Sequence, residues 1–256
     1  MIQDQQPAPV SPAETFPPPQ RIQLPQTTPV VTYTLLGISI FVYLLQLGSQ
    51  LIFDFDWPAA YGVKYNPLIE AGQFWRLLTP LLLHGSILHL AFNMYALYVL
   101  GRRIERFFGH YRFLALYTIG GFAGNILSML FTSAASLGSS TAIFGLLGAE
   151  GVFIYQHRAI LGERAKQALQ QIIQVAVINL LIGLSPGIDN WGHVGGLLGG
   201  ATFTWLAGPL LQIGGLPPFQ RIEDARPPRT VSLVFGALTI LLAALAGGII
   251  YLRVKN

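Results

Sequence analysis

Seven apolar stretches alternate with polar segments along the chain. They cover about residues 31–53, 82–100, 113–132, 140–156, 168–184, 191–211 and 231–252. A bilayer core about 30 Å thick takes about 20 helical residues, so each stretch is interpreted as one membrane-spanning helix. The fourth and fifth stretches are short, and the fifth is the weakest because it carries Gln170, Gln171, Gln174 and Asn179. The pattern predicts an all-α fold, a polytopic membrane helix bundle.

Composition supports a membrane protein. Charged residues make up 10 % of the chain and hydrophobic residues 52 %, whereas a soluble domain carries about 25 % charged residues. The chain has no cysteine, which excludes a disulfide framework, a thiol nucleophile and a cysteine-ligated metal site. The net charge of +4 is interpreted as a topology signal in the loops. We therefore expect the lipid bilayer as a partner and no nucleic acid.

The apolar pattern also divides the chain into three parts. Residues 1–29 are polar and rich in proline, and no apolar signal-peptide core follows Met1. This composition is typical of a disordered tail. We expect a disordered, proline-rich cytoplasmic tail over 1–29, a six-helix core over 30–211, and a linker with a seventh transmembrane helix over 212–256.

Lysine and arginine residues indicate the orientation in the membrane. If the N-terminus lies in the cytoplasm, eleven of the fifteen Lys and Arg residues face the cytoplasm and four face the outside. The positive-inside rule favours this orientation. Arg253 and Lys255, which then lie outside, are discordant, and a seventh helix appended to a six-helix core explains them.

Four polar side chains fall at one depth on the outer side of the bilayer. Ser140 begins the fourth span, about 17 residues and hence about 25 Å above the cytoplasmic end of that span. His193 begins the sixth span. His89 and Asn93, four residues apart, share one face of the second span. The sequence thus predicts that three helices bring these side chains to the same level.

Each of these features has a plainer interpretation when taken alone. A serine that follows Gly138 at a helix start is usually a cap, and an intramembrane His or Asn often serves as a hydrogen bond between helices. Gly196 and Gly200, three and seven residues after His193, serve ordinary helix packing, although they also allow a close approach. Polar groups inside a span are costly, so their convergence favours function. A serine nucleophile with a histidine base and oxyanion donors is the chemistry that this set suits.

The motifs around these residues resemble those of the rhomboid family of intramembrane serine proteases, over about residues 70 to 205. Gly138-Ser139-Ser140 resembles the family's Gly-x-Ser motif, and the segment around His193 resembles its His-x-x-Gly motif. The second-span pattern His…His-x-x-x-Asn is matched by His84, His89 and Asn93; the Trp-Arg pair by Trp75 and Arg76; and Gly-x-x-x-Glu-x-x-x-Gly by Gly101, Glu105 and Gly109.

The resemblance implies a bacterial-type rhomboid with six core helices and a seventh, which cleaves transmembrane proteins with a Ser-His dyad, no third acid, no cofactor and no metal. It implies these roles: Ser140 as nucleophile, His193 as base, His89 and Asn93 as oxyanion side chains, His84 as a structural loop anchor, and Phe144 as an aromatic ring against the histidine.

Three further residues receive separate interpretations. Asp189, four residues before His193, is interpreted as a loop residue rather than a third catalytic acid. Thr141 stands where the family usually has glycine, and its bulk is expected near the scissile bond, where it would narrow substrate choice. Glu150 lies about 15 Å inward from Ser140; we expect it near the cytoplasmic end, neutral or paired, and without a catalytic role.

Other functions remain open on the sequence. A catalytically silent rhomboid-like binder of transmembrane segments would keep the fold without needing the hydroxyl. A transporter or channel lined by His89, His193 and Asn93 is disfavoured by the lack of an evident inverted repeat. A metalloprotease is disfavoured because His84 and His89 form no H-E-x-x-H frame. The absence of a targeting signal favours a bacterial inner membrane with the active site toward the outer face, and the oligomeric state stays open.

Overall fold

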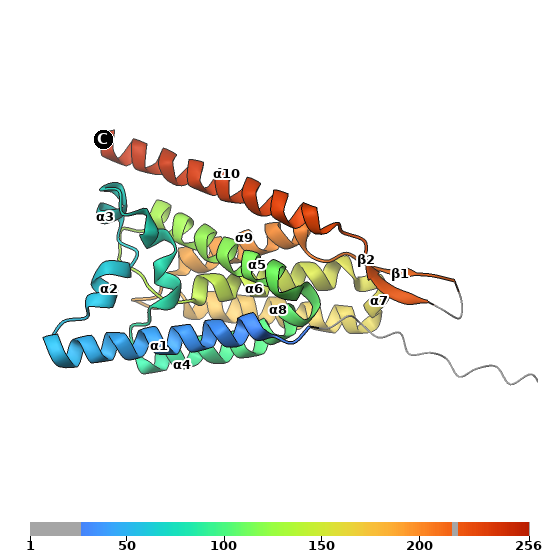
Figure 1. Ribbon diagram of the computed structural model, residues 1–256. Helices are drawn as coiled ribbons and strands as arrows, with labels where there is room; N and C mark the ends of the chain where they lie inside the picture. The colour runs from blue at the N-terminus through green and yellow to red at the C-terminus, as the bar shows by residue number, and fades with distance from the viewer. Residues whose placement is uncertain (1–26, 217–219, 256) are drawn as a thin grey trace, which may run out of the picture.

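The computed structural model describes residues 27–216 and 220–255, so most of the expected tail over 1–29 lies outside the described residues. The described chain is a bundle of long helices (Figure 1). The short helices of the first loop lie at one end of the bundle and a two-stranded hairpin at the other. The predicted helical bundle is therefore confirmed as the fold class.

The long helices follow the apolar stretches, with shifted bounds. The second stretch does not begin at residue 82: helix α4 begins only at Ile87, after a break at Gly85 and Ser86. The long helices are α1 (Val30–Phe53), α4 (Ile87–Ala96), which continues through one π-helical turn, η3 (Leu97–Gly101), into α5 (Arg102–Phe131), then α6 (Ser140–Gln156), α8 (Glu163–Ile182), α9 (Asn190–Ala207) and α10 (Pro228–Lys255).

Gly109 separates the second and third stretches inside α5. Its φ of 75° and ψ of 167° are not helical, and this region of backbone space is essentially reserved for glycine. The glycine therefore lets the chain break one helix and start the next without an intervening loop. This is why the structure joins two spans that the sequence predicts as separate.

The sixth stretch was predicted to run to residue 211, but α9 ends at Ala207. Gly208 precedes Pro209, and a residue before proline is pushed out of the helical region. Leu211 instead begins strand β1 (Leu211–Gly214), which pairs antiparallel with β2 (Arg221–Asp224). The predicted linker before the seventh helix thus contains a hairpin that the apolar pattern did not reveal.

The helices form an inner and an outer layer. α5, α6 and α9 pack most extensively against one another, and α6 is almost wholly buried. The outer helices expose large apolar side chains, such as Phe92 at 73 % and Ile240 at 72 %. Four helical segments are long and apolar enough to cross a membrane: 30–53, 87–131, 163–182 and 228–255. An apolar exterior around a buried helical core is the arrangement that a bilayer requires, and the chain is an integral membrane protein.

Short helices organise the first loop: α2 (Trp57–Gly62), α3 (Asn66–Glu70), and the 3-10 turns η1 (Phe74–Leu77) and η2 (Thr79–Leu82). The Arg76 side chain, which is 2 % exposed, donates to the carbonyl oxygens of Val63 (2.9 Å) and Ala60 (2.8 Å) and to Gln73 Oε1 (2.7 Å). Burial lowers the pKa of Arg76. The buried guanidinium therefore joins three residues of the first loop and fixes the shape of the loop.

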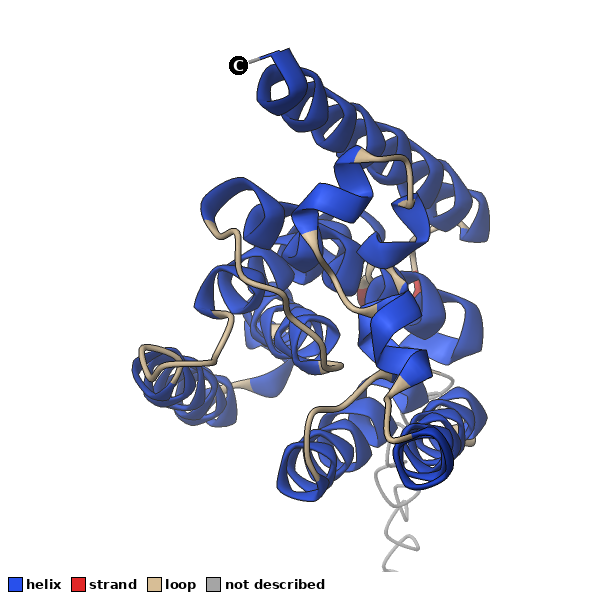
Figure 2. Cartoon of the chain, turned by 90° about the vertical axis from the view of Figure 1, so that its left-hand side faces the viewer, coloured by secondary structure: helices blue, strands red, loops and turns tan. Residues whose placement is uncertain are grey.

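The first loop lies against the segment that leads into α6. Lys64 and Ser136 exchange two backbone hydrogen bonds of 2.9 and 3.0 Å, and the Gly138 N–H donates to the Pro80 carbonyl at 2.9 Å. Figure 2 looks at this end of the bundle, where short helices and loops cover the ends of the long helices. This cover fixes the position of the α6 N-terminus.

Candidate active site

Ser140 is the first residue of α6, and the glycine two residues before it shapes its approach. Gly138 has a φ of +128°, in the region that side chains rarely adopt. A Cβ atom there would lie 2.7 Å from both Cε1 and Nε2 of His89. Glycine is thus required twice at this position, for the backbone turn and for the close approach of the imidazole.

Ser140 and His193 come from different helices and meet at hydrogen-bond distance. His193 Nε2 lies 3.0 Å from Ser140 Oγ. The Phe144 ring, one turn along α6, stacks on the imidazole with the ring centroids 4.2 Å apart and an angle of 9° between the planes. His193 is 8 % exposed. The stacking and burial hold the imidazole in one orientation toward the hydroxyl.

Glycine contacts bring the two helices this close. A Cβ atom on Gly196 would lie 2.0 Å from the Thr141 carbonyl oxygen, and one on Gly200 would lie 2.0 Å from the Gly145 carbonyl oxygen. No side chain fits between α6 and α9 at these positions, so backbone touches backbone. The distance between Ser140 and His193 follows from this contact.

His89 and Asn93 approach the same place from α4. The Ser86 side chain caps α4 by accepting from the His89 N–H at 3.1 Å. Asn93 is 6 % exposed, and its Nδ2 has no hydrogen-bond partner among the described residues. A Cβ atom on Gly138 would lie 3.7 Å from this Nδ2. A buried donor without a partner beside the Ser140 loop is suited to an anion that forms there.

His84 lies behind this group of residues, in the connection between η2 and α4. Its backbone N–H donates to Gln46 Oε1 (3.0 Å) and its carbonyl accepts from Gln46 Nε2 (3.2 Å), so α1 holds the segment in place. Its Nε2 lies 3.4 Å from Ser139 Oγ, and its ring meets that of His89 edge-on at 5.3 Å. These contacts fit a residue that braces the loops around Ser140.

Asp189 does not reach the His193 side chain. One carboxylate oxygen accepts from the Gly192 N–H at 3.0 Å, which caps α9, and the other accepts from the Ser128 hydroxyl. His193 Nδ1 is buried and has no hydrogen-bond partner among the residues that the structure describes. The described geometry thus contains a Ser-His pair without a carboxylate behind it.

A buried lysine completes the polar chain at Asp189, and the sequence interpretation missed it. Lys64 is 0 % exposed, and its Nζ donates to Ser128 Oγ at 2.8 Å. Burial lowers the pKa of Lys64 to about 8, although the Asp189 charge acts in the opposite direction. Lys64, Ser128 and Asp189 therefore link the first loop, α5 and the start of α9. Only the pairing of the first loop with residue 136 brings Lys64 there, so no motif pointed to it.

The Thr141 side chain is directed between helices. The residue is 5 % exposed, and its side chain packs against Gly124 of α5 and Gly192 of α9; a Cβ atom on Gly124 would lie 2.6 Å from Thr141 Cβ. Its bulk therefore fills space between helices that glycines leave open. This packing does not favour the expected crowding of the scissile bond by the side chain, and the effect of Thr141 on substrate choice stays a prediction.

Glu150 is paired, as expected, with the Arg103 guanidinium at 2.6 Å. It lies ten residues along α6 from Ser140. Within 27–216 and 220–255, no group of three or more His, Asp or Glu side chains is placed to hold a metal ion.

Comparison with known proteins identifies the family. A family model described as the Rhomboid domain matches residues 71–210, more than half of the chain. "Rhomboid protease GluP" of Bacillus subtilis (strain 168) is 39 % identical over 173 residues, which cover 67 % of this chain and 34 % of that protein. In Arabidopsis thaliana, RHOMBOID-like protein 5 is 42 % identical over 142 residues (54 % of this chain and 46 % of that protein). RHOMBOID-like protein 7 is 37 % identical over 170 residues (64 % and 50 %).

The chain spans about a third to a half of the length of these relatives. The matched residues 71–210 include Ser140, His193 and the α4 pair His89 and Asn93. On the family model and these identities, the chain belongs to the rhomboid family.

Proposed function

We propose that the chain is an intramembrane serine endopeptidase that hydrolyses peptide bonds in or near transmembrane segments of other membrane proteins. The observation that carries the proposal is the 3.0 Å separation of Ser140 Oγ and His193 Nε2. The name of the Bacillus relative, a rhomboid protease, supports the same class of activity. No cofactor is needed for this chemistry.

In the first half of the reaction Ser140 acts as the nucleophile. When His193 Nε2 is unprotonated, the Ser140 hydroxyl donates to it and gives up its proton as Oγ attacks the substrate carbonyl carbon. The tetrahedral intermediate then collapses, and His193 delivers the proton to the leaving amine. The products of this half are the amine fragment and an ester between the other fragment and Ser140.

The negative oxygen of the tetrahedral intermediate needs donors. Ser140 begins α6, and N–H groups in the first turn of a helix have no partner within the helix. The unpartnered Asn93 Nδ2 and the nearby His89 ring are side-chain donors on the other side of the Ser140 loop. Groups already in place stabilise the developing charge without reorganisation.

In the second half a water molecule attacks the ester. His193 takes the proton from that water and returns it to Ser140 Oγ as the acyl group leaves. Phe144 keeps the imidazole in position through both halves, and the Ser-His dyad needs no third acid. The Asp189 carboxylate acts on the start of α9 instead of on the imidazole.

The proposal includes a membrane orientation. The N-terminus lies in the cytoplasm and the Ser140 end of α6 lies toward the outer face, as the charge distribution favours, in a bacterial inner membrane. A substrate transmembrane helix must unwind locally before its carbonyl groups are accessible, because helical carbonyls are hydrogen-bonded. Helix-breaking residues in the substrate should therefore raise the cleavage rate.

Cleavage of a labelled transmembrane substrate in detergent and in liposomes tests the proposal. We would compare wild type with Ser140→Ala and His193→Ala and label each protein with a fluorophosphonate probe. Ser136→Ala is the matched control, because Ser136 lies in the same loop and its described hydrogen bonds are made by its backbone alone. Wild type and Ser136→Ala should cleave and be labelled, whereas the other two variants should do neither.

Two other outcomes have distinct meanings. Labelling of Ser140 without cleavage would support Ser140 as the nucleophile and would mean that the substrate chosen for the assay is not one that the protein cleaves. Neither labelling nor cleavage by folded wild type would overturn the protease and favour a silent binder of transmembrane segments.

A further inference from the structure

A cavity of about 400 Å³ opens in the half of the bundle opposite Ser140. Glu150, at its edge, lies about 15 Å along α6 from Ser140. The walls come from α5, α6, the short helix α7 (Arg158–Leu161), α8 and the β1–β2 hairpin. The volume lies in the range of about 300–1,000 Å³ that is typical of small-molecule sites. The mechanism proposed above uses none of this space.

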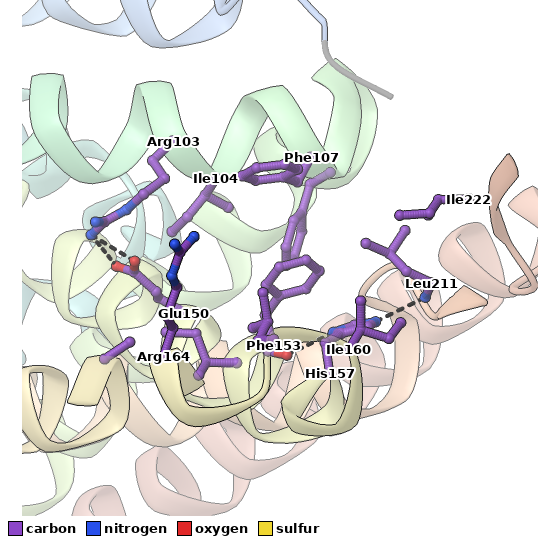
Figure 3. A pocket seen from close by; sticks show the side chains of 14 residues that line it. Arg103, Ile104, Phe107, Glu150, Phe153, His157, Ile160, Arg164, Leu211 and Ile222 are labelled. Atoms are coloured by element: carbon purple, nitrogen blue, oxygen red, sulfur yellow. Dashed lines mark hydrogen bonds and ion pairs between the residues drawn. The ribbon is translucent and has the colours of Figure 1, made fainter. Parts of the chain in front are cut away.

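Most of the cavity wall is apolar. Figure 3 shows the rings of Phe107 and Phe153 in the middle of the pocket, with Leu211 and Ile222 of the hairpin to one side. His157 adds no charge in this arrangement: its Nδ1 lies 2.7 Å from the Phe153 carbonyl, and its Nε2 accepts from the Leu211 N–H at 2.8 Å. An imidazole that donates through one nitrogen and accepts through the other is neutral.

The opposite side of the cavity carries an excess of positive charge. Arg103 and Glu150 form an ion pair of 2.6 Å that neutralises both. The Arg164 guanidinium from α8 extends into the same side of the pocket (Figure 3). The described residues give it no hydrogen-bond or ion-pair partner, so one free cation faces an apolar cavity.

We propose that this cavity holds one acyl chain of an anionic phospholipid from the surrounding bilayer, with the lipid phosphate on Arg164. The apolar wall matches a hydrocarbon chain, and a planar guanidinium matches phosphate oxygens. Glu150 has a defined part in this site: it holds Arg103 at the cavity edge and leaves Arg164 as the unpaired cation. Charge complementarity thus selects an anionic lipid over a zwitterionic one.

Such a lipid would lie against the C-terminal half of α6, the helix that begins with Ser140. It would join α5, α6 and α8 at the end of α8 that carries Ala165, the residue of α8 that is buried. Binding to the folded state alone would stabilise the protein against unfolding. Lipid binding in this cavity does not depend on the proposed protease activity.

Native mass spectrometry of the full chain in detergent tests the lipid site. The probes are phosphatidylglycerol and phosphatidylcholine with identical acyl chains, titrated into delipidated protein. Arg164→Ala removes the free cation. Lys166→Ala is the matched control, because Lys166 is an exposed cation on the same helix that does not line the cavity. Ala168→Phe fills the cavity, and Gln170→Phe adds the same ring outside it.

Wild type should bind phosphatidylglycerol more tightly than phosphatidylcholine. Arg164→Ala should weaken phosphatidylglycerol binding about tenfold, the loss of one charge-assisted contact. It should weaken phosphatidylcholine binding less, because the choline ammonium of that lipid already offsets the charge of its phosphate. Lys166→Ala and Gln170→Phe should match wild type, and folded Ala168→Phe should lose both lipids.

Equal losses in Arg164→Ala and Lys166→Ala would overturn the site, because they would mean a diffuse surface charge. Full lipid binding by folded Ala168→Phe would also overturn it. If Ala168→Phe does not fold, the comparison of Arg164→Ala with Lys166→Ala still tests whether the lipid binds at this cavity. Binding of free glycerol phosphate as tight as that of the lipid would exclude a role for the acyl chain.

Discussion

Lys64 in the first loop and Ser128 in α5 lie 2.8 Å apart, with the ammonium group donating to the hydroxyl. Both residues are fully buried. Ser128 in turn donates to Asp189, which caps α9. The Ser128 hydroxyl therefore connects a charged loop residue with the helix that carries His193. The charge of Lys64 should therefore affect the stability of the structure that holds His193.

Stability should rise with pH as Lys64 loses its proton. Its pKa is about 8 in the folded protein and 10.5 in the unfolded chain. Between these values the unfolded chain binds more protons, so the free energy of unfolding increases from about pH 8 to about pH 10.5. Below pH 8 both states are protonated and the contribution is constant. Thermal unfolding in detergent at pH 7, 8.5 and 9.5 measures the trend.

Lys64→Met supplies the control, because it keeps an unbranched side chain only one heavy atom shorter and removes the titrating group. The difference in Tm between wild type and this variant should change in favour of wild type as pH rises from 7 to 9.5. Superimposable pH profiles of the two proteins would show that Lys64 does not titrate in this window.

Asp189→Ala should reduce activity by less than 100-fold. The variant loses the cap of α9, worth about 1 kcal/mol, and leaves Ser128 without its acceptor, but it removes no group that touches His193 Nδ1. Asp189→Asn keeps a carbonyl oxygen for the Gly192 N–H and should be milder. The cleavage rate per folded molecule, measured together with Tm, distinguishes a loss of stability from the loss of a catalytic group. A loss beyond 100-fold in a fully folded Asp189→Ala protein would instead assign Asp189 to the catalytic machinery.

Gly138→Ala should abolish most activity at a modest loss of stability. The new Cβ atom would lie 2.7 Å from the ring of His89 and would push aside this side chain, which we propose as an oxyanion donor. Loss of one such donor costs about 100-fold or more in rate. Gly72→Ala isolates the backbone effect, since Gly72 has a φ of +97° and nothing within 4 Å of its Cβ position. Both variants should lose similar stability, about 1–3 kcal/mol, and Gly72→Ala should keep its specific activity. Similar specific activities of the two folded variants would contradict a role for the His89 contact.

The sequence predicted the polar group around Ser140 because each member carries a local signal. Gly138 precedes a serine at a helix start, His89 and Asn93 share a helix face, and Gly196 and Gly200 mark a face without side chains. These signals depend on helical period and residue size, which are local properties. Their meeting in space then followed from a common depth in the membrane.

Residues that depend on the folding of loops were not predictable in this way. Lys64 and Arg76 are the other two of the four cations that the predicted orientation places outside, yet they are 0 % and 2 % exposed. Their burial arises because the first loop folds back on α5 and on itself, through contacts between residues distant in sequence. The β1–β2 hairpin was missed for a related reason: its strands have four residues each and follow directly on an apolar helix. The direction of the Thr141 side chain depended on Gly124, which lies on another helix.

Gly200→Ala should destabilise the protein, although it adds one methyl group. That carbon would lie 2.0 Å from the Gly145 carbonyl oxygen and 2.5 Å from Gly145 Cα. Both neighbours are backbone atoms of a buried helix, so α6 and α9 must separate, at a cost of about 1–3 kcal/mol or more. Gly236→Ala on α10 is the matched control, because nothing lies within 4 Å of its Cβ position. The Tm in detergent should fall for Gly200→Ala and hold or rise slightly for Gly236→Ala, since alanine favours helix.

Because the same separation would move His193 away from Ser140, the folded fraction of Gly200→Ala should also label more slowly with a fluorophosphonate. An unchanged Tm and labelling rate would mean that the two helices are not in backbone contact at this position.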